Sequence, residues 1–313
     1  MHKLAIVIPY YKIDHFEQTL ISLAAQTDQR FALYIGNDYS PEDPLPLLLK
    51  YLPANAYSYF IYSENLGRKN LALQWARILE QVQEPWFQLL GDDDFISANF
   101  VETINRQLES LDEEINVIKV KSQLCDAQGK AFKRLYEGFK TGRYNVLDLM
   151  LMKFRGRLNS SLSEHVFRLS RYQEVGFARY VLAWHTDDML VVQMADCADL
   201  QFVADALVSV RVYEGSTSGS QKNLLLKIAA SKHFYIDFMQ LLIRGAYPWD
   251  RKKAFLKSLH KYKNELGMPY LEAMYRRNGM IGRAHFLKYE LRMLLKACMP
   301  TAVLRRVSKT EID

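Results

Sequence analysis

Two different spacings of apolar residues alternate along the first 125 residues. Short apolar runs rich in β-branched and aromatic residues alternate with segments in which apolar residues recur every three or four positions. We expect strands at 4–9, 31–38, 56–63, 85–90 and 115–122. We expect helices at 15–26, 44–52, 70–82 and 99–111. This alternation predicts an α/β fold with a mixed, mostly parallel central sheet flanked by helices.

The pattern becomes less regular after about residue 125. We expect helices at 145–154 and 185–198, a strand and short helix within 163–177, two strand-like runs within 200–213, and a Gly/Ser-rich loop at 214–220. From 221 onward nearly every segment has helical spacing and is rich in Lys and Arg. The sequence therefore predicts one domain over 1–220, with halves 1–125 and 126–220, followed by a basic helical extension over 221–313.

Composition is that of an ordinary globular protein, with 49% apolar and 24% charged residues and a net charge of +6. The cysteines Cys125, Cys197 and Cys298 are too far apart for a zinc site or a disulfide framework, which favours a reducing, cytoplasmic location. The N-terminal apolar run ends in a proline and is expected to be a strand rather than a signal peptide. The sequence contains no run of about 18 apolar residues, so we expect no membrane-spanning helix. We expect no nucleic-acid partner.

Polar clusters follow the first four predicted strands. They are YYK at 10–12, GNDYS at 36–40, SENLGRKN at 63–70 and GDDD at 91–94. In open α/β sheets ligands bind outside the carboxyl ends of the strands, where such clusters meet. The sequence therefore predicts a polar ligand site at one edge of the sheet.

The three consecutive carboxylates of GDDD repel one another unless a cation neutralises them. Mg²⁺ and Mn²⁺ prefer such oxygen ligands and commonly share them with phosphate oxygens and water. Either Asp92 with Asp94, or Asp92 with Asp93, can converge on one ion. The alternative is an acidic turn that caps the following helix.

These clusters, with HTDD at 185–188 and RVYEGSTS at 211–218, resemble in order and spacing the family-2 glycosyltransferases of the GT-A fold. The resemblance covers about 3–220. It implies that GDDD is the DxD motif, which holds Mn²⁺ or Mg²⁺ and the donor diphosphate. Gly91 stands where the family usually has an acid, so the metal ligands come from among Asp92, Asp93 and Asp94.

The resemblance also implies a binding site for the donor nucleotide. Asp38 would accept a hydrogen bond from the base, often uracil, while Arg211 would pair with phosphate. The remaining donor-binding residues would be Pro9, Tyr11, Gly67, Arg68, Lys69 and Asp92. The alternatives are an Asn-Asp turn at Asp38, a solvated basic helix start, and an ordinary flexible connector after Arg211.

The resemblance further implies that the second acid pair, Asp187 and Asp188, supplies the base that an inverting transfer requires. By resemblance Asp188 is that base, and Asp187 takes the place of a family glutamate. A positioned base contributes about 10²–10⁴-fold to the rate. The alternative is a helix start whose acids are favoured by the helix dipole alone.

The resemblance implies an inverting transfer of one sugar from a nucleoside-diphosphate sugar, often a UDP-sugar, to a hydroxyl. The acceptor would be a glycan or lipid-linked glycan of bacterial surface polysaccharide synthesis. The basic segment 292–309 suggests peripheral contact with an anionic membrane, or simply a solvated helical subdomain. One rival is a nucleotidyltransferase, but PYYKIDHF at 9–16 lacks the expected Gly-rich loop. The other rival is a catalytically silent binding subunit, against which both retained acid clusters argue.

Overall fold

A computed structural model describes residues 2–220 and 222–244, together with the isolated positions 254, 255, 280, 284, 287 and 291. The chain divides into two compact units, 1–234 and 235–313, and the fold and site below belong to the first. The predicted helices beyond 244 and the segment 292–309 lie outside the described residues.

The first half of the sheet consists of four parallel strands in the order β3-β2-β1-β4. The strands are β1 (Leu4–Tyr10), β2 (Ala32–Asn37), β3 (Ser58–Ile61) and β4 (Trp86–Leu89). The helices that connect and follow them are α1 (Phe16–Ala24), α2 (Leu45–Tyr51), α3 (Leu71–Leu79) and α4 (Phe100–Glu109). The predicted strands and helices of this half are thus all present, with ends shifted by a few residues.

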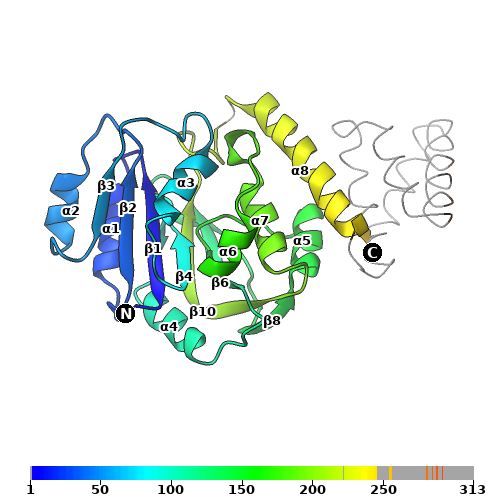
Figure 1. The fold of residues 1–313 in the computed structure, drawn as a ribbon, viewed down its shortest axis with the longest axis horizontal. Coiled ribbons are helices and arrows are strands. Elements are labelled where there is room, and N and C mark those ends of the chain that lie inside the picture. Colours follow the sequence, from blue (N-terminus) through cyan, green and yellow to red (C-terminus); the bar gives the residue numbers. More distant parts are fainter. Residues whose placement is uncertain are drawn as a thin grey trace. The chain divides into compact units, whose positions relative to one another are not determined.

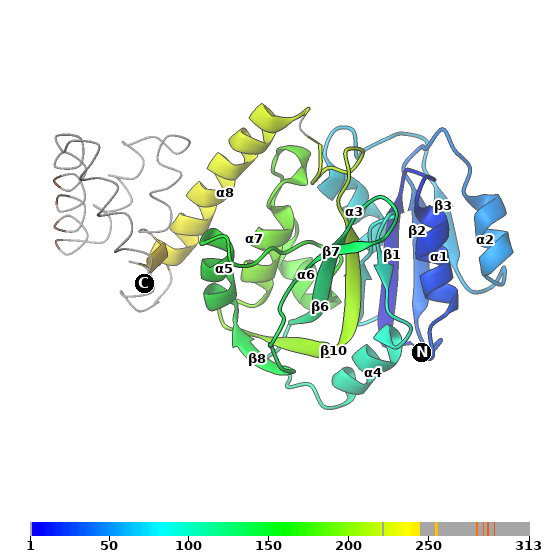
Figure 2. The same cartoon turned by 180° about the vertical axis from the view of Figure 1, so that it is seen from behind.

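The order in which strands are added to the sheet reverses between β3 and β4, although all four strands stay parallel. It builds outward from β1 to β3 and then returns through α3 to place β4 on the other side of β1. Because crossover connections are right-handed, this reversal puts α1 and α3 on opposite faces, as Figures 1 and 2 show. In sheets of this kind ligands bind in a crevice at the carboxyl ends of the strands on either side of the reversal, which here are β1 and β4.

The second half of the sheet is mixed. Strand β9 (His165–Arg168) lies antiparallel between β4 and β6 (Val117–Cys125), and β10 (Asp199–Arg211) runs parallel to β6. Three short strands complete it: β5 (Phe95–Ile96), β7 (Ala131–Arg134) and β8 (Gly142–Asn145). The two strand-like runs predicted within 200–213 form one strand, with a register shift between Val203 and Leu207. The predicted mixed α/β fold is confirmed.

The remaining helices gather on the side of the sheet that carries α3 in Figure 1. They are α5 (Val146–Phe154), α6 (Leu169–Val175), the short 3₁₀ helix η1 (Val181–Ala183) and α7 (Thr186–Met194). Helix α8 (Leu224–Arg244) begins in the first unit and continues past Phe234, where that unit ends. Within the described residues, none of the helices is both long and apolar enough to cross a membrane.

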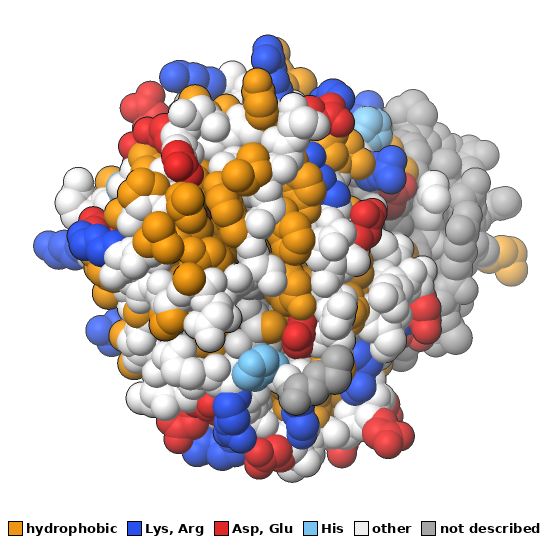
Figure 3. All heavy atoms as spheres, turned by 60° about the vertical axis from the view of Figure 1, so that its left-hand side comes forward, with side chains coloured by type: hydrophobic (Ala, Val, Ile, Leu, Met, Phe, Trp, Pro, Cys, Tyr) orange, Lys and Arg blue, Asp and Glu red, His pale blue; other side chains and the backbone are white. Residues whose placement is uncertain are grey.

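The core forms where both faces of the sheet are covered. Leu4–Ile8 of β1 are completely buried, as a continuous apolar run in a central strand predicts. The apolar face of α1, formed by Phe16, Leu20 and Leu23, is also completely buried. The edge strand β3 is different, because Ile61 is 72% exposed, and Figure 3 shows apolar side chains gathered on this side of the molecule.

Candidate active site

Asp92 joins the carboxyl ends of β1 and β4. Its Oδ2 atom accepts hydrogen bonds from the backbone N–H groups of Tyr11, at 2.7 Å, and Lys12, at 2.8 Å. The two strands are neighbours in the sheet, so the loops that leave them meet at the crevice. One oxygen of Asp92 is thus committed to holding the first loop in place.

Asp94 points into the protein and is only 5% exposed. Its Oδ1 atom accepts from the backbone N–H of Arg211 at 2.8 Å, and its Oδ2 atom accepts from the hydroxyl of Ser163. Burial raises the pKa of Asp94 to about 6, although these donors oppose the shift. Both oxygens of Asp94 therefore have protein partners, and its role here is to hold the acidic loop.

Asp93 is the member of the cluster that remains available. It is half-exposed, and no other described residue donates a hydrogen bond to its carboxylate. Burial, together with the charges of Asp94 and Asp92, raises the pKa of Asp93 to about 8. An unrelieved repulsion between neighbouring carboxylates is what a bound divalent cation removes.

The acidic cluster fits a cation that is shared with a phosphate-bearing ligand. Among the described residues, no three His, Cys, Asp or Glu side chains converge as a complete metal cage. Mg²⁺ is typically held by one or two carboxylates together with substrate phosphates and water. Asp93 and the second oxygen of Asp92 match that donor set.

Asp38 holds the loop between β3 and α3. It is 3% exposed, and its oxygens accept from the backbone N–H groups of Leu66 and Gly67, each at 2.8 Å. The guanidinium of Arg77 forms an ion pair with the same carboxylate. A Cβ atom at Gly67 would lie 2.5 Å from Oδ2 of Asp38, so a glycine is required at this close approach. Asp38 thus shapes this side of the crevice, and its carboxylate is already engaged by protein donors.

The other predicted donor-binding residues lie around the same crevice. Pro9 is half-exposed at the end of β1, and Tyr11 is 39% exposed, with its carbonyl accepting from the hydroxyl of Ser40 at 2.7 Å. Arg68 is exposed, and Lys69 forms a surface ion pair with Glu64 at 2.9 Å. Tyr11 and Arg68 therefore present free surface to a ligand.

Arg211 lies beneath the acidic loop and is 2% exposed. Its guanidinium donates to the carbonyls of Asp93 at 2.9 Å, Asp126 at 3.0 Å and Ala127 at 2.6 Å, and also to the side chain of Gln18. These contacts leave little donor capacity for phosphate. The structure thus favours a structural role for Arg211 over the phosphate contact that the resemblance implies.

The loop after β10 lies beside the aspartates. The ring of Tyr213 packs edge-on against His15, with centroids 4.7 Å apart, and the ammonium of Lys12 donates to the carbonyl of Gly215. Burial, followed by the charges of Asp93 and Asp92, raises the pKa of Tyr213 to about 12. Lys12 is therefore a cation at the crevice that the sequence interpretation missed, although it belongs to the quoted YYK cluster.

The second acid pair begins α7, and its two members have different surroundings. Asp188 is 2% exposed, and the ammonium of Lys153 contacts both of its oxygens, with 2.7 Å to Oδ2. The Nδ1 atom of His185 also lies 2.7 Å from Oδ2. Burial alone would raise the pKa of Asp188, but Lys153 and His185 hold it well below its usual range. A carboxylate with these contacts is poorly placed to accept a proton from a substrate.

Asp187 is half-buried, and no cation among the described residues forms an ion pair with it. Burial and the neighbouring charge of Asp188 raise the pKa of Asp187 to about 7. This combination of access and basicity is what a general base needs near neutral pH. Of the two aspartates, Asp187 therefore has the surroundings that a general base requires.

The start of α7 lies at the same edge of the sheet as the acidic cluster. The side chain of Asn70, which caps α3, donates to the carbonyl of Tyr180 at 3.0 Å. The ammonium of Lys227 lies 4.6 Å from the ring centroid of Trp184 and donates to the carbonyl of Ser220 at 2.8 Å. The loop beside Asp93 and the segment that leads to Asp187 are thus linked through α8.

Solved structures of glycosyltransferases share this arrangement of strands and helices. TarS 1-349 from S. aureus superposes with a TM-score of 0.62 at 12% identity, covering 84% of this chain and 73% of that one. The same TarS fragment with UDP-GlcNAc gives 0.58 at 14% identity, covering 88% and 85%. This chain has the GT-A glycosyltransferase fold.

A second glycosyltransferase gives a similar match. The mannosyltransferase PcManGT from Pyrobaculum calidifontis, in complex with GDP-Man and Mn²⁺, superposes with a TM-score of 0.55 at 13% identity, covering 93% of this chain and 80% of that one. No protein-family model and no curated protein matches the sequence. Structural matches at such low sequence identity establish the fold alone and do not establish the activity.

Proposed function

We propose that this chain is an inverting glycosyltransferase that moves a single sugar from a nucleoside-diphosphate sugar to an acceptor hydroxyl. The observation that carries the proposal is the acidic cluster at the crevice between β1 and β4. Two of its aspartates are tied to the protein, while Asp93 faces solvent with a pKa raised to about 8. The GT-A fold supports the same conclusion.

Asp93 and the free oxygen of Asp92 would hold Mn²⁺ or Mg²⁺ at the crevice. The bound ion would neutralise the negative charge that develops on the departing diphosphate. Asp94 fixes the loop from below through Ser163 and the backbone of Arg211. Pro9 and Tyr11 would flank the base of the donor, and Arg68 and Lys12 would approach its phosphates.

The transfer itself is a single displacement at the anomeric carbon. Asp187 takes the proton from the acceptor hydroxyl, whose oxygen forms the new bond to the anomeric carbon on the face opposite the diphosphate. The bond from that carbon to the diphosphate oxygen breaks, and the diphosphate leaves with the bonding electrons. The loop over 212–220 lies beside the aspartates and would limit the access of water.

The donor proposed here is a UDP-sugar and the acceptor a glycan or lipid-linked glycan. The TarS fragment in complex with UDP-GlcNAc supports a uridine donor, whereas the mannosyltransferase in complex with GDP-Man marks guanosine as the alternative. A cytoplasmic enzyme of surface-polysaccharide assembly, with membrane contact only at its surface, fits these substrates.

A donor panel tests the proposal. We would incubate the purified chain with Mn²⁺, a mixture of sugar acceptors and either UDP-sugars or GDP-mannose, and measure the release of nucleoside diphosphate with and without a chelator. We expect metal-dependent release with one donor class. Release of pyrophosphate from a nucleoside triphosphate would instead support a nucleotidyltransferase. Donor binding without any turnover would support a silent binding subunit.

A further inference from the structure

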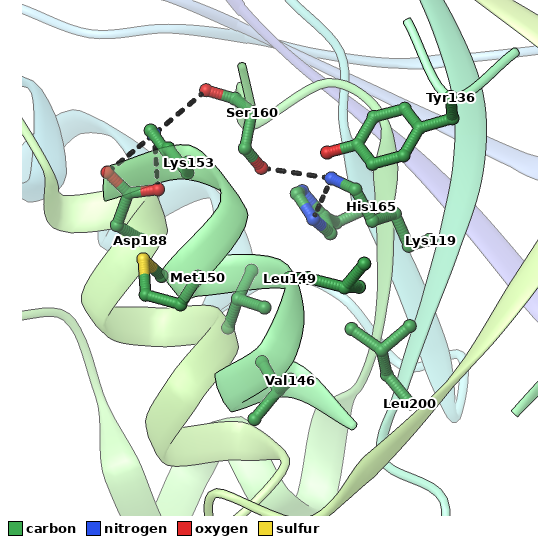
Figure 4. A pocket seen from close by; sticks show the side chains of 11 residues that line it. Lys119, Tyr136, Val146, Leu149, Met150, Lys153, Ser160, His165, Asp188 and Leu200 are labelled. Carbon is green, nitrogen blue, oxygen red and sulfur yellow. Dashed lines mark hydrogen bonds and ion pairs between the residues drawn. The ribbon is translucent and has the colours of Figure 1, made fainter. Parts of the chain in front are cut away.

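Lys153 contacts Asp188 of the second acid pair from inside the unit, as Figure 4 shows. It projects from α5 toward α7, where its ammonium binds both carboxylate oxygens of Asp188 and reaches the carbonyl of Ser160 at 3.3 Å. The side chain of Lys153 is 21% exposed and that of Asp188 is 2% exposed. Nothing in the proposed binding of donor or metal uses this lysine.

The hydrogen-bonded network continues behind Lys153. The hydroxyl of Ser160 lies 2.9 Å from the ammonium of Lys119, which also forms an ion pair with Glu164 and lies 2.9 Å from Nε2 of His165. Lys119, Ser160 and His165 line a cavity of about 20 Å³ together with Lys153 and Asp188, and it has room for about one water molecule. The network is therefore a fixed internal support and not a substrate pocket.

His185 fixes the acid pair from the other side. Its Nδ1 atom contacts Asp188, its Nε2 atom lies 3.0 Å from the hydroxyl of Ser231 on α8, and its ring stacks on Phe234 with centroids 4.5 Å apart. The backbone of His185 is left-handed, with φ of 69°, immediately before α7 begins. The first turn of α7 is thus held by contacts from α5 and α8.

We propose that Lys153 is a positioning residue that makes Asp187, and not Asp188, the base of the reaction; this inference rests on the proposed glycosyl transfer. Consecutive residues of a helix point about 100° apart, so the two carboxylates face different directions. Lys153 draws Asp188 inward and occupies both of its oxygens. Asp187 is left on the more exposed side of the turn, where an acceptor hydroxyl can reach it.

The charges around the pair predict how the loss of Lys153 would change it. Burial and Asp188 raise the pKa of Asp187, whereas Lys153 lowers it and Glu164 raises it. The charged and titratable groups that interact with the pair come from several neighbouring elements: His185, Lys153, Glu164, His165, Lys119 and Tyr136. Without Lys153 the two carboxylates would share a proton that they release only at higher pH.

The pH dependence of kcat tests this role. A base must be ionised, so kcat should rise with pH through the pKa of Asp187, at about 7. We expect Lys153→Met to lower kcat at pH 7 by about tenfold or more and to move this rise upward by about one pH unit, with little change in the donor KM. Lys153→Arg, which keeps the charge, should restore the position of the rise.

Lys119→Met is the matched control, because it removes a buried lysine of the same network that contacts Glu164 and not Asp188. We expect it to lower stability and to move the pH rise much less than Lys153→Met does, because Lys119 interacts with Asp188 only across the network, without contacting it. A Lys153→Met enzyme whose pH rise coincides with that of the wild type would overturn the positioning role, even if kcat fell.

A second measurement separates this inference from the proposed function. Wild-type protein labelled with ¹³C at the aspartate carboxyls, with Asp187→Asn and Asp188→Asn to assign the signals, reports each titration without any turnover. We expect Asp187 to titrate near neutral pH while Asp188 stays ionised. Asp188 titrating near neutral pH would refute the role of Lys153. A wild type that shows this order but transfers no sugar would refute only the proposed function.

Discussion

The two acid clusters of this protein, Asp92–Asp94 and Asp187–Asp188, both place aspartates next to one another in the sequence. They differ in the groups that surround the carboxylates. In each cluster one carboxylate is buried among protein donors, as in Asp94 and Asp188, and a neighbour keeps solvent access and a raised pKa, as in Asp93 and Asp187. The second cluster has its own cation in Lys153, and the imidazole of His185 contacts the same carboxylate. The first has mostly backbone N–H donors and lacks an ion pair among the described residues. This difference supports the proposal that the first cluster binds a metal ion and the second takes a proton from the acceptor.

The largest expected effect is on the cluster that needs a cation. Asp93→Asn removes the solvent-facing carboxylate, so we expect metal-dependent donor binding to disappear and transfer to fall by about 10³-fold or more, since a bound metal supplies several kcal/mol. Calorimetry with UDP or GDP and Mn²⁺, together with turnover, measures both effects. Glu109→Gln, an exposed acid at the end of α4, is the control. Equal donor affinity in Asp93→Asn and wild type would remove Asp93 from the metal site.

The next effect separates chemistry from binding. Asp187→Asn should lower kcat by about 10²–10⁴-fold because the acceptor proton loses its base, while donor affinity in the presence of Mn²⁺ stays at the wild-type value. Single-turnover kinetics and calorimetry on the same preparation would check this. If Asp187→Asn kept its activity and a folded Asp188→Asn lost it, the assignment implied by the family resemblance would be restored.

Sequence reasoning found both clusters because each is a local signal. Adjacent aspartates after a buried strand, or in the first turn of a helix, are visible in a short window. Which aspartate faces solvent depends instead on distant partners: Ser163 and Arg211 lie 69 and 117 residues from Asp94. Lys153 lies 35 residues from Asp188 and reads in sequence as one more polar position on an amphipathic helix.

The fold shows the same division between local and distant information. Periodicity predicted the first four strands and their helices, because a parallel α/β unit repeats the same local pattern. It could not predict that β9 would enter the sheet antiparallel between β4 and β6, since strand order depends on long-range pairing. The surroundings of Arg211 could not be predicted for a similar reason: its guanidinium donates to carbonyls of a segment about 85 residues away.

Replacing an aspartate by asparagine should change the stability of the protein in opposite directions in the two clusters. Asp188→Asn leaves the ammonium of Lys153 without its charged partner inside the unit, so we expect a loss of about 3 kcal/mol in the free energy of unfolding. Urea unfolding followed by circular dichroism would measure it. The double variant with Asp188→Asn and Lys153→Met should lose less free energy of unfolding than the sum of the two single variants. In the double variant no buried ammonium is left without a charged partner. Additive losses would show that the ion pair is not the source of the effect.

The smallest effect is the opposite one, in metal-free protein. Folded Asp93 holds its proton up to a pKa of about 8, whereas the unfolded chain releases it near pH 4, so folding binds a proton between these values and stability falls as pH rises. In chelator at pH 8, Asp93→Asn should therefore gain about 1 kcal/mol after allowance for solvent screening, and its decline in stability with pH should be shallower. Thermal unfolding at about pH 5 and pH 8 measures both. A variant that is less stable than wild type under these conditions would mean that the cluster is not strained without a metal, and the contrast between the two acid pairs would lose its physical basis.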